Sequence, residues 1–244
     1  MGKRKRVVVG REAIKKRLQR MMTLREQYEA DIDNVHIKLQ KGNSKTGSNC
    51  YTISLIPIAD CLNCSGCWID CYDIQHDCIY PSVIDSRAKN SAVHRKDRKR
   101  FWQEVDAEIK EKCVTQLRLN VGGDLDFADF EFIRAVGEWN PQCDILFFTK
   151  NYDEHNAFID MYIATYPNNY GYPDNVKPIY SAWIGMEMKN PYGVPVSHVL
   201  WEDGSTTAPE YGSYFCGGNC SRCHFNKEGC WTLKNGESVI FEAH

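Results

Sequence analysis

The stretch LRLNVGGDLDFADFEFIRAVGEWNPQCDILFFT, residues 117–149, decides the predicted fold. Residues 117–121 and 144–149 read as short strands, and the unbroken apolar run of the second is typical of a buried parallel strand. The segment between them, about 127–139, spaces its apolar residues as one face of a helix. A strand, a helix and a strand at this spacing predict a βαβ unit on a parallel sheet.

The same alternation extends outward from this unit. We expect further strands and helices on both sides, with the polar residues 82–90 as a loop between the first strand and the next helix. After residue 185 the pattern loosens until a last short strand. The expected strands are 51–58, 178–184 and 238–241, and the expected helices are 11–30, 92–112 and 153–166.

The alternating part ends near residue 184, so it is too short for a full eight-unit barrel, which takes about 250 residues. We therefore predict an α/β chain with a partial (β/α) barrel or an open parallel sheet, an N-terminal basic helix and a C-terminal cysteine-rich metal-binding tail. The loop at 41–49, rich in Gly, Ser and Asn, divides a basic helical arm and linker (1–47) from an α/β body (48–244).

The composition excludes several classes of protein. Of 244 residues, 43% are hydrophobic and 25% are charged, which is close to the average for soluble globular proteins. No run approaches the roughly 18 apolar residues of a membrane span, and no apolar signal-peptide core follows the N-terminal charges. We expect a cytoplasmic protein with no membrane partner.

The unusual feature is the cysteine content, 12 residues. A disulfide framework is disfavoured because the chain is long, shows no export signal and falls below the roughly 8–10% cysteine of such scaffolds. Eight cysteines instead form two dense motifs. The first motif (within 61–78) is Cys61, Cys64, Cys67 and Cys71, and the second (216–231) is Cys216, Cys220, Cys223 and Cys230. The remaining four, Cys50, Cys78, Cys113 and Cys143, are read as buried small hydrophobic residues, with Cys78 the least secure because it lies near the first motif.

The first motif has the C-x2-C-x2-C-x3-C spacing of bacterial ferredoxins, with Tyr72 in place of the usual proline. Closely spaced thiolates on an irregular loop suit a [4Fe–4S] cluster. Zinc is the alternative, although zinc sites more often use two separate C-x2-C pairs. The spacing thus predicts metal binding and leaves the metal open.

The second motif has four cysteines, enough to close a site of its own. A structural zinc or an auxiliary iron–sulfur cluster is the simpler interpretation. The alternatives are that the two motifs meet in space, with Cys71 completing a shared site, or that His224 replaces one thiolate.

Charge is distributed unevenly. Residues 1–20 carry a net charge of +8, which leaves −10 for the remainder of a chain of net charge −2. A basic arm could bind nucleic acid or a host protein, and the simpler interpretation is a solvated terminus. An apolar stripe along 11–30 is expected to pack on the body or on a partner. The candidate contact residues of the arm are Lys3, Arg4, Lys5, Arg6, Lys15, Lys16 and Arg17.

Gly122, Gly123 and Asp124 follow the strand 117–121. The two glycines would let a backbone approach a ligand, and the carboxylate could take a ligand ammonium group. A tight turn capped by Asp124 or Asp126 explains them equally well. Because function gathers at the carboxyl ends of parallel strands, this loop and the first motif are expected at the same edge of the sheet.

These motifs together resemble the gene product 88 family of phages and mobile elements. The resemblance runs over about residues 48–235 and leaves the basic arm outside. It rests on the segments CWIDCY (67–72), LRLNVGGD (117–124), FFTK (147–150), CSRC (220–223) and CW (230–231). It implies this order of cysteine motif, strands and cysteine tail, and no particular activity.

The layout is similar, more remotely, to radical S-adenosylmethionine enzymes. These have a partial (β/α) barrel, three cluster cysteines after the first strand and a Gly-Gly-Glu turn after the second. The resemblance implies that Gly122, Gly123 and Asp124 bind the amino group of S-adenosylmethionine, and that Cys64, Cys67 and Cys71 hold the cluster with Cys61 as the extra cysteine. The chain departs from that pattern in its cysteine spacing and in having Asp in place of Glu.

The leading hypothesis is therefore a phage-type iron–sulfur protein on a radical S-adenosylmethionine-like scaffold, with catalysis and substrate, small molecule or macromolecule, left open. The alternative is a non-enzymatic module, stabilised by zinc or a cluster, that binds nucleic acid or a host protein through residues 1–20. A conventional hydrolase is disfavoured because the chain has no G-x-S-x-G, H-E-x-x-H or P-loop motif.

Overall fold

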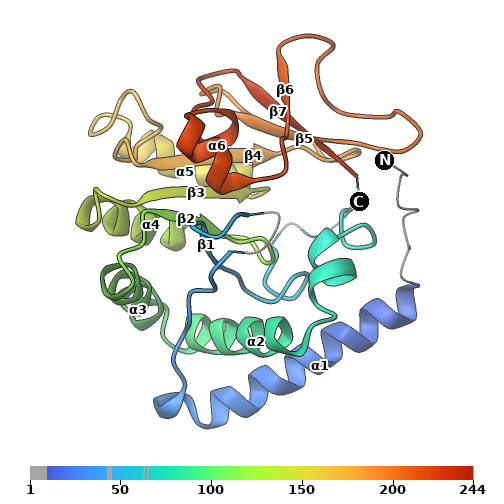
Figure 1. Ribbon diagram of the computed structural model, residues 1–244, viewed down its shortest axis with the longest axis vertical. Helices are drawn as coiled ribbons and strands as arrows, with labels where there is room; N and C mark the ends of the chain where they lie inside the picture. The colour runs from blue at the N-terminus through green and yellow to red at the C-terminus, as the bar shows by residue number, and fades with distance from the viewer. Residues whose placement is uncertain (1–9, 43–45, 63, 65, 244) are drawn as a thin grey trace.

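A computed structural model describes residues 10–42, 46–62, 64 and 66–243 (Figure 1). Seven strands form one sheet in the order β1-β2-β3-β4-β5-β7-β6. Every neighbouring pair is parallel, and β1 and β6 lie at the two edges. The prediction of an α/β chain with an open parallel sheet is thus confirmed. The strands are β1 (Tyr51–Ile53), β2 (Gln116–Leu119), β3 (Asp144–Thr149), β4 (Val176–Ser181), β5 (Val196–Leu200), β6 (Ser213–Phe215) and β7 (Ser238–Glu242).

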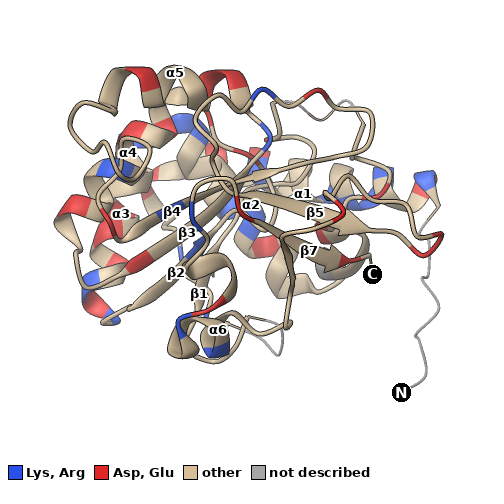
Figure 2. Ribbon diagram, turned by 90° about the horizontal axis from the view of Figure 1, so that it is seen from above, with Lys and Arg blue, Asp and Glu red and all other residues tan. Residues whose placement is uncertain are grey.

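The helices of the described chain are α1 (Arg11–Ala30), α2 (Pro81–Lys96), α3 (Arg98–Glu111), α4 (Phe127–Trp139), α5 (Tyr152–Tyr162) and α6 (Cys220–Asn226), with short turns η1 (Ile32–Asn34), η2 (Asp73–Asp77) and η3 (Gly229–Trp231). Figure 2 shows the charged residues gathered mainly on the helices, while the strands are largely uncharged. This pattern fits a sheet whose residues are mostly withdrawn from water.

One face of the sheet packs on α3, α4 and α5 and forms the main core. Leu117, Ile145 and Phe147 point to this face and are buried with Phe130 of α4 and Phe158 of α5. Because side chains alternate between the two faces along a strand, the neighbours of these residues point to the other face of the sheet. Hydrophobic burial on this face is the main stabilising contribution to the fold.

The second face, which we call the cavity face, carries the alternate residues of the same strands. In part it is apolar: Leu146 and Ile179 are buried against Trp231 of η3. Elsewhere it is polar, with Thr52, Arg118, Asn120, Ser181 and Ser197 at inward positions. A parallel sheet packed on both faces normally has apolar residues throughout, so these polar positions indicate a face that borders a cavity.

Two sequence predictions for 82–112 are wrong. Residues 82–90 belong to α2 and are not a loop, and the expected helix 92–112 is divided at Asp97, which caps α3 by accepting a hydrogen bond from the Arg100 amide. The buried face of α2 consists largely of small and polar residues such as Ala88, Asn90 and Ser91. Such a face lacks the large apolar periodicity that marks a helix in a sequence.

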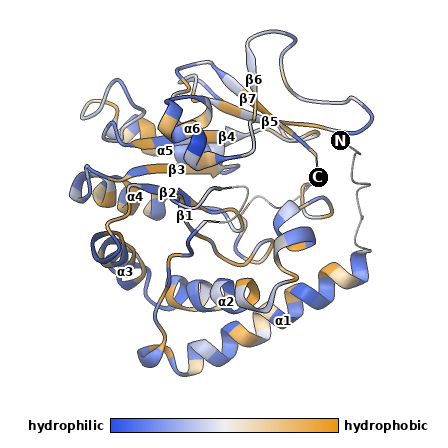
Figure 3. Cartoon of the chain, in the orientation of Figure 1, coloured by the Kyte–Doolittle hydropathy of each residue, from blue (hydrophilic) through white to orange (hydrophobic). Residues whose placement is uncertain are grey.

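The helix α1 packs on the body, as its apolar stripe predicted. Figure 3 shows hydrophobic and hydrophilic residues alternating along it. Ile14 and Met21 are buried with Ile74 of η2 and Ile84 of α2, and Arg17 donates two hydrogen bonds to the carbonyl oxygens of Ile74 and Gln75. This helix therefore supports the segment that follows the first cysteine motif.

Candidate metal and ligand-binding cavity

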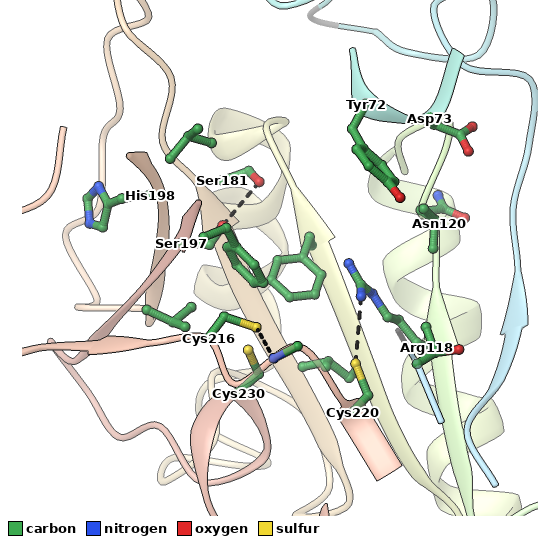
Figure 4. A pocket seen from close by; sticks show the side chains of 18 of the residues that line it. Tyr72, Asp73, Arg118, Asn120, Ser181, Ser197, His198, Cys216, Cys220 and Cys230 are labelled. Carbon is green, nitrogen blue, oxygen red and sulfur yellow. Dashed lines mark hydrogen bonds between the residues drawn. The ribbon is translucent and has the colours of Figure 1, made fainter. Parts of the chain in front are cut away.

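A cavity of about 1970 Å³ lies against the cavity face of the sheet. All eight cysteines of the two motifs line it, together with Asp124 and Lys150 from the carboxyl edge, Arg118 from β2 and Asn120 directly after β2. Figure 4 shows Arg118 and Asn120 on one strand, opposite Cys216, Cys220 and Cys230. Segments more than 100 residues apart in the sequence thus contribute to one space.

The first motif lies after β1, at the carboxyl edge of the sheet. The backbone amide of Asp124 donates to the carbonyl oxygen of Asp60, next to Cys61, so the glycine loop and the first motif meet as expected. The Cys64 thiol contacts both Cys61 and Cys67, with 4.0 Å between the sulfur atoms of Cys64 and Cys67. The motif spans two positions, 63 and 65, that lie outside the described residues.

One thiol of the first motif is prepared for ionisation. The hydrogen bond from the Cys64 thiol, aided by the charge of Lys150, lowers the pKa of Cys67 to about 6 although burial opposes this. Burial raises the pKa of Cys71 to about 12. The thiolate is the form that binds metals, so the lowered pKa makes Cys67 available as a ligand at neutral pH.

Most of the second motif lies toward the amino-terminal ends of β1 and β3, whereas Cys216 follows the carboxyl end of β6. His224 of α6 bonds to the carboxylate of Asp144, the first residue of β3, at 2.5 Å. The Trp231 indole donates to the carbonyl oxygen of Cys220, and the Ser221 amide donates to Thr46. The two motifs therefore border different ends of one cavity, and the described contacts of His224 are with Asp144 and the Trp231 ring.

Sequence reasoning missed a fifth cysteine beside the second motif. Cys50, directly before β1, is fully buried and shares a hydrogen bond with Cys220. That bond, together with the charge of Arg118, lowers the pKa of Cys220 to about 6 against burial. Arg118 donates to the Cys220 sulfur at 3.7 Å. Only the pairing of β1 with β2, which the sequence does not specify residue by residue, brings Cys50 to this place.

The other scattered cysteines fit their interpretation unevenly. Cys143 and Cys78 are fully buried, and the Cys78 thiol donates to the carboxylate of Asp73 at 3.7 Å. Cys113 is exposed, so its prediction as a buried residue is wrong. It follows α3 with a positive φ of 50°, at a turn where the side chain projects into solvent.

The donor set suits a thiolate-bound metal. All twelve cysteines are free thiols, and each motif presents several of them to the cavity. Two thiolates on one tetrahedral zinc lie about 3.8 Å apart, given a Zn–S distance of about 2.3 Å, and the Cys64–Cys67 separation is close to this value. Within the described residues, however, no three His, Cys, Asp or Glu side chains are grouped closely enough to hold an ion as they stand. Metal binding at either motif therefore requires thiol side chains to turn toward a common centre.

Gly122 and Gly123 are explained by close packing. A Cβ atom on Gly122 would lie 1.9 Å from a carboxylate oxygen of Asp73, and one on Gly123 would lie 2.7 Å from the Cβ of Leu55. Gly123 also has a φ of +81°, which disfavours any residue with a side chain. The glycines thus allow the segment after β1 to cross the loop after β2.

Asp124 joins two neighbouring loops. Its carboxylate accepts hydrogen bonds from the Leu125 amide (2.8 Å), the Thr149 hydroxyl (2.7 Å) and the Lys150 amide (2.9 Å). Burial raises the pKa of this carboxyl group, although these bonds act in the opposite direction. The three protein donors occupy most of its roughly four acceptor positions.

The basic residues of the arm fall into two groups. Lys3, Arg4, Lys5 and Arg6 lie outside the described residues. Lys15 and Lys16 are exposed on α1, where Lys15 pairs with Glu12 at 3.2 Å, and Arg17 is engaged with η2. No helix among the described residues has both the length and the apolar character needed to cross a membrane.

Comparison with known proteins identifies one family. No curated protein and no solved structure matches the chain. The sequence profile described as gene product 88 matches residues 24–187. The match begins within α1 and includes the first cysteine motif, the glycine loop and β1 to β4, and it ends before the second motif. Since this match covers well over half of the 244 residues, the chain belongs to the phage-type gene product 88 family.

Proposed function

We propose that this protein is an iron–sulfur protein that binds a cluster at the first cysteine motif and a small-molecule ligand in the adjoining cavity. The observation that carries the proposal is that all eight motif cysteines line one cavity and that the first motif lies at the carboxyl edge of a parallel sheet. In such sheets ligands bind at that edge, because the loops there are free to vary while the strands hold them in place.

The residues that would hold the cluster are Cys61, Cys64 and Cys67. The Cys64 thiol contacts the other two, whereas Cys71 interacts with Cys61 only through its charge, and its raised pKa makes it a poorer thiolate. This set differs from the Cys64, Cys67 and Cys71 triplet that the remote resemblance implied. Three cysteine ligands would leave one iron open, and a reduced cluster of this kind supplies an electron for the cleavage of S-adenosylmethionine.

The chain's own residues would tune this site. Lys150 lies near Cys67 and places a positive charge beside the thiolate. Its ammonium group also lies 5.5 Å from the centre of the Trp183 ring, which keeps the side chain over the cavity. At the second motif, Arg118 offers the same kind of charge to Cys220, and four cysteines there would suit a structural zinc or an auxiliary cluster.

The test is anaerobic reconstitution of the full chain with iron and sulfide, followed by metal analysis and a visible spectrum. We expect a brown protein whose iron falls in Cys64→Ser and Cys67→Ser and is retained in Cys113→Ser, the matched control at an exposed cysteine outside the cavity. A colourless protein that holds only zinc would contradict the proposal, because zinc has no d–d absorption.

Catalysis has a separate test. The reduced, reconstituted protein is incubated with S-adenosylmethionine, and 5′-deoxyadenosine is measured. We expect product from the wild type and none from Cys67→Ser. If the iron-loaded wild type gives no product, the protein binds a cluster without this chemistry.

A second candidate function rests on α1. Arg11, Lys15, Lys16 and Arg20 are exposed along this helix and could contact the phosphates of a nucleic acid. The expected result is an affinity that falls steeply with salt and drops when Lys16 and Arg20 are changed to Gln. The substitution Lys99→Gln, at an exposed lysine of α3, serves as the control. Salt-independent binding, or none, would rule out this function.

A further inference from the structure

We propose that Arg118 and Asn120 form an anion-binding site on the floor of the cavity, which takes a carboxylate or phosphate group of the substrate. The inference deepens the proposed function by naming the substrate class. It depends on the cavity being a ligand site and is independent of which metal the cysteines bind. The observation that carries it is a pair of polar side chains on one strand with donor atoms left unpaired.

Both residues come from β2 and the residue that follows it. Both side chains line the cavity, that of Arg118 from within β2 and that of Asn120 from the turn directly after it. Figure 4 shows them one above the other with the Arg118 side chain directed into the space. Two adjacent donors on a rigid strand can hold a ligand group with little loss of side-chain freedom.

The donors are incompletely used by the protein. Within the described chain, the one hydrogen-bond partner of Arg118 is the Cys220 sulfur, and its buried Nε atom has none. Asn120 is only 9% exposed, and its Nδ2 atom has no partner among the described residues. An unpaired buried donor costs about 1–3 kcal/mol, so an acceptor from a ligand would relieve an existing cost.

The charges around the site favour an anion. The guanidinium of Arg118 lies 4.9 Å from the centre of the Phe148 ring, in a partly apolar wall that strengthens electrostatic interactions. Of the carboxylates that line the cavity, Asp73 pairs with Arg87, and Asp124 accepts from Leu125, Thr149 and Lys150. The negative groups that act on Arg118 are the thiols Cys220, Cys230 and Cys50. The planar fork of an arginine matches the oxygens of a carboxylate or phosphate.

The local backbone also argues for a specific use of Asn120. It has a φ of +50°, a conformation that most residues with side chains avoid and that asparagine tolerates. The substitution Asn120→Asp keeps the size and this tolerance, removes the Nδ2 donor and adds a negative charge. It therefore tests the site with little disturbance of the fold.

The experiment uses the full-length protein of measured metal content, titrated with inorganic phosphate and, separately, with acetate at constant ionic strength. Binding is followed by the NMR signal of the Arg118 Nε–H group. We expect saturable binding that weakens about 10- to 100-fold in Asn120→Asp and in Arg118→Lys, because each loses a hydrogen bond to a charged group. The tighter of the two anions identifies the ligand group.

The controls carry the same chemical changes elsewhere. Asn34→Asp alters an exposed residue of η1, and Arg134→Lys alters an arginine of α4 on the far side of the sheet. Both should bind as the wild type does. In Arg118→Lys the Nε–H signal is absent, so its affinity is taken from calorimetry, which is applied to every variant.

A wild type that binds neither anion saturably, or variants that bind as tightly as the wild type, would overturn the proposal. The iron content is measured on the same samples. Loss of anion binding with retained iron rejects only this site, and retained anion binding in an iron-free protein rejects only the cluster. If Asn120→Asp does not fold, Arg118→Lys gives the result, since it keeps the positive charge at that position.

Discussion

The clearest test of the carboxyl edge is the substitution Asp124→Asn. The carboxylate accepts from two backbone amides and one hydroxyl, all within 2.9 Å. An amide side chain has one acceptor oxygen, and its NH2 group would face either the Lys150 amide or the Leu125 amide. In both orientations one backbone donor loses its partner.

The magnitude follows from that single loss. A donor left unsatisfied in a partly buried place costs about 1–3 kcal/mol, so we expect a decrease of about 2 kcal/mol in the free energy of unfolding. Part of the cost of burying the carboxylate is recovered, because burial raises the pKa of Asp124 and so disfavours its charged form. For a chain of this size the decrease lowers Tm by about 4–8 °C.

Urea unfolding followed by circular dichroism measures the stability, and amide hydrogen exchange at Leu125 and Lys150 reports the local opening. Asp174→Asn, at an exposed aspartate, makes the same change of charge and should stay within about 0.5 kcal/mol of the wild type. If Asp124→Asn is as stable as the wild type and yet binds S-adenosylmethionine less well, our reasoning is refuted. Asp124 would then be a ligand-binding residue, as the remote resemblance implied.

Three further predictions concern stability. Gly122→Ala should lower the free energy of unfolding by at least 2 kcal/mol, because the new Cβ would displace Asp73 from its buried ion pair with Arg87. Gly217→Ala, at a position with open space around it, is the control in the same urea assay. Burial lowers the pKa of His155 to about 3. The neutral ring therefore stabilises the fold fully above its ordinary pKa of about 6.5, and this contribution decreases as the pH falls toward 3. We expect a loss of about 2 kcal/mol between pH 6.5 and pH 5, absent from His155→Leu, and equal pH slopes for the two proteins would contradict it. Arg17→Ala should cost about 1–3 kcal/mol and loosen η2, seen as faster amide exchange at Ile74 and Gln75, whereas the exposed Lys16→Ala should change neither.

The tyrosine network around His155 gives a physical reason for its neutral form. The Tyr180 hydroxyl donates to Asn156, so it accepts from Nδ1 of His155, and Nε2 accepts from Tyr172. A protonated ring would have a donor at Nε2, facing the hydroxyl of Tyr172, and both residues are fully buried. We therefore expect acid to weaken the contact between His155 of α5 and Tyr180 of β4.

The central elements could be predicted because their sequences show both an apolar pattern and residues that mark where the element begins or ends. The helix 127–139 and the strand 144–149 coincide with α4 and β3. The α4 helix has a capping box between Asp126 and Asp129, and β3 is a continuous apolar run. Both signals are local, so no tertiary information is needed to find them.

The elements after residue 185 could not be predicted in the same way. β5 and β6 are only five and three residues long, and β6 lies at the sheet edge with Phe215 largely exposed. α6 is only seven residues long and is held by Asn219 at its first turn and by Trp231. Such elements are stabilised by their contacts with the sheet. The residues of the sheet lie far away in the sequence, so a local stretch does not reveal these contacts.

The cysteine motifs, too, could be predicted only as far as local sequence defines them. Spacing was enough to select eight thiols that line one cavity, since dense cysteines on loops point to a shared site. Spacing did not select Cys50 or Arg118, which reach the second motif from strands more than 100 residues away in the chain. A guanidinium withdrawn from water needs a negative partner, and the negative groups that act on Arg118 among the described residues are the thiols Cys220, Cys230 and Cys50. The positive charge of Arg118 therefore constrains the second motif. Neutral thiols would leave this charge without compensation. Deprotonated cysteines on a bound metal would balance the charge and would leave the remaining donors of Arg118 for a ligand.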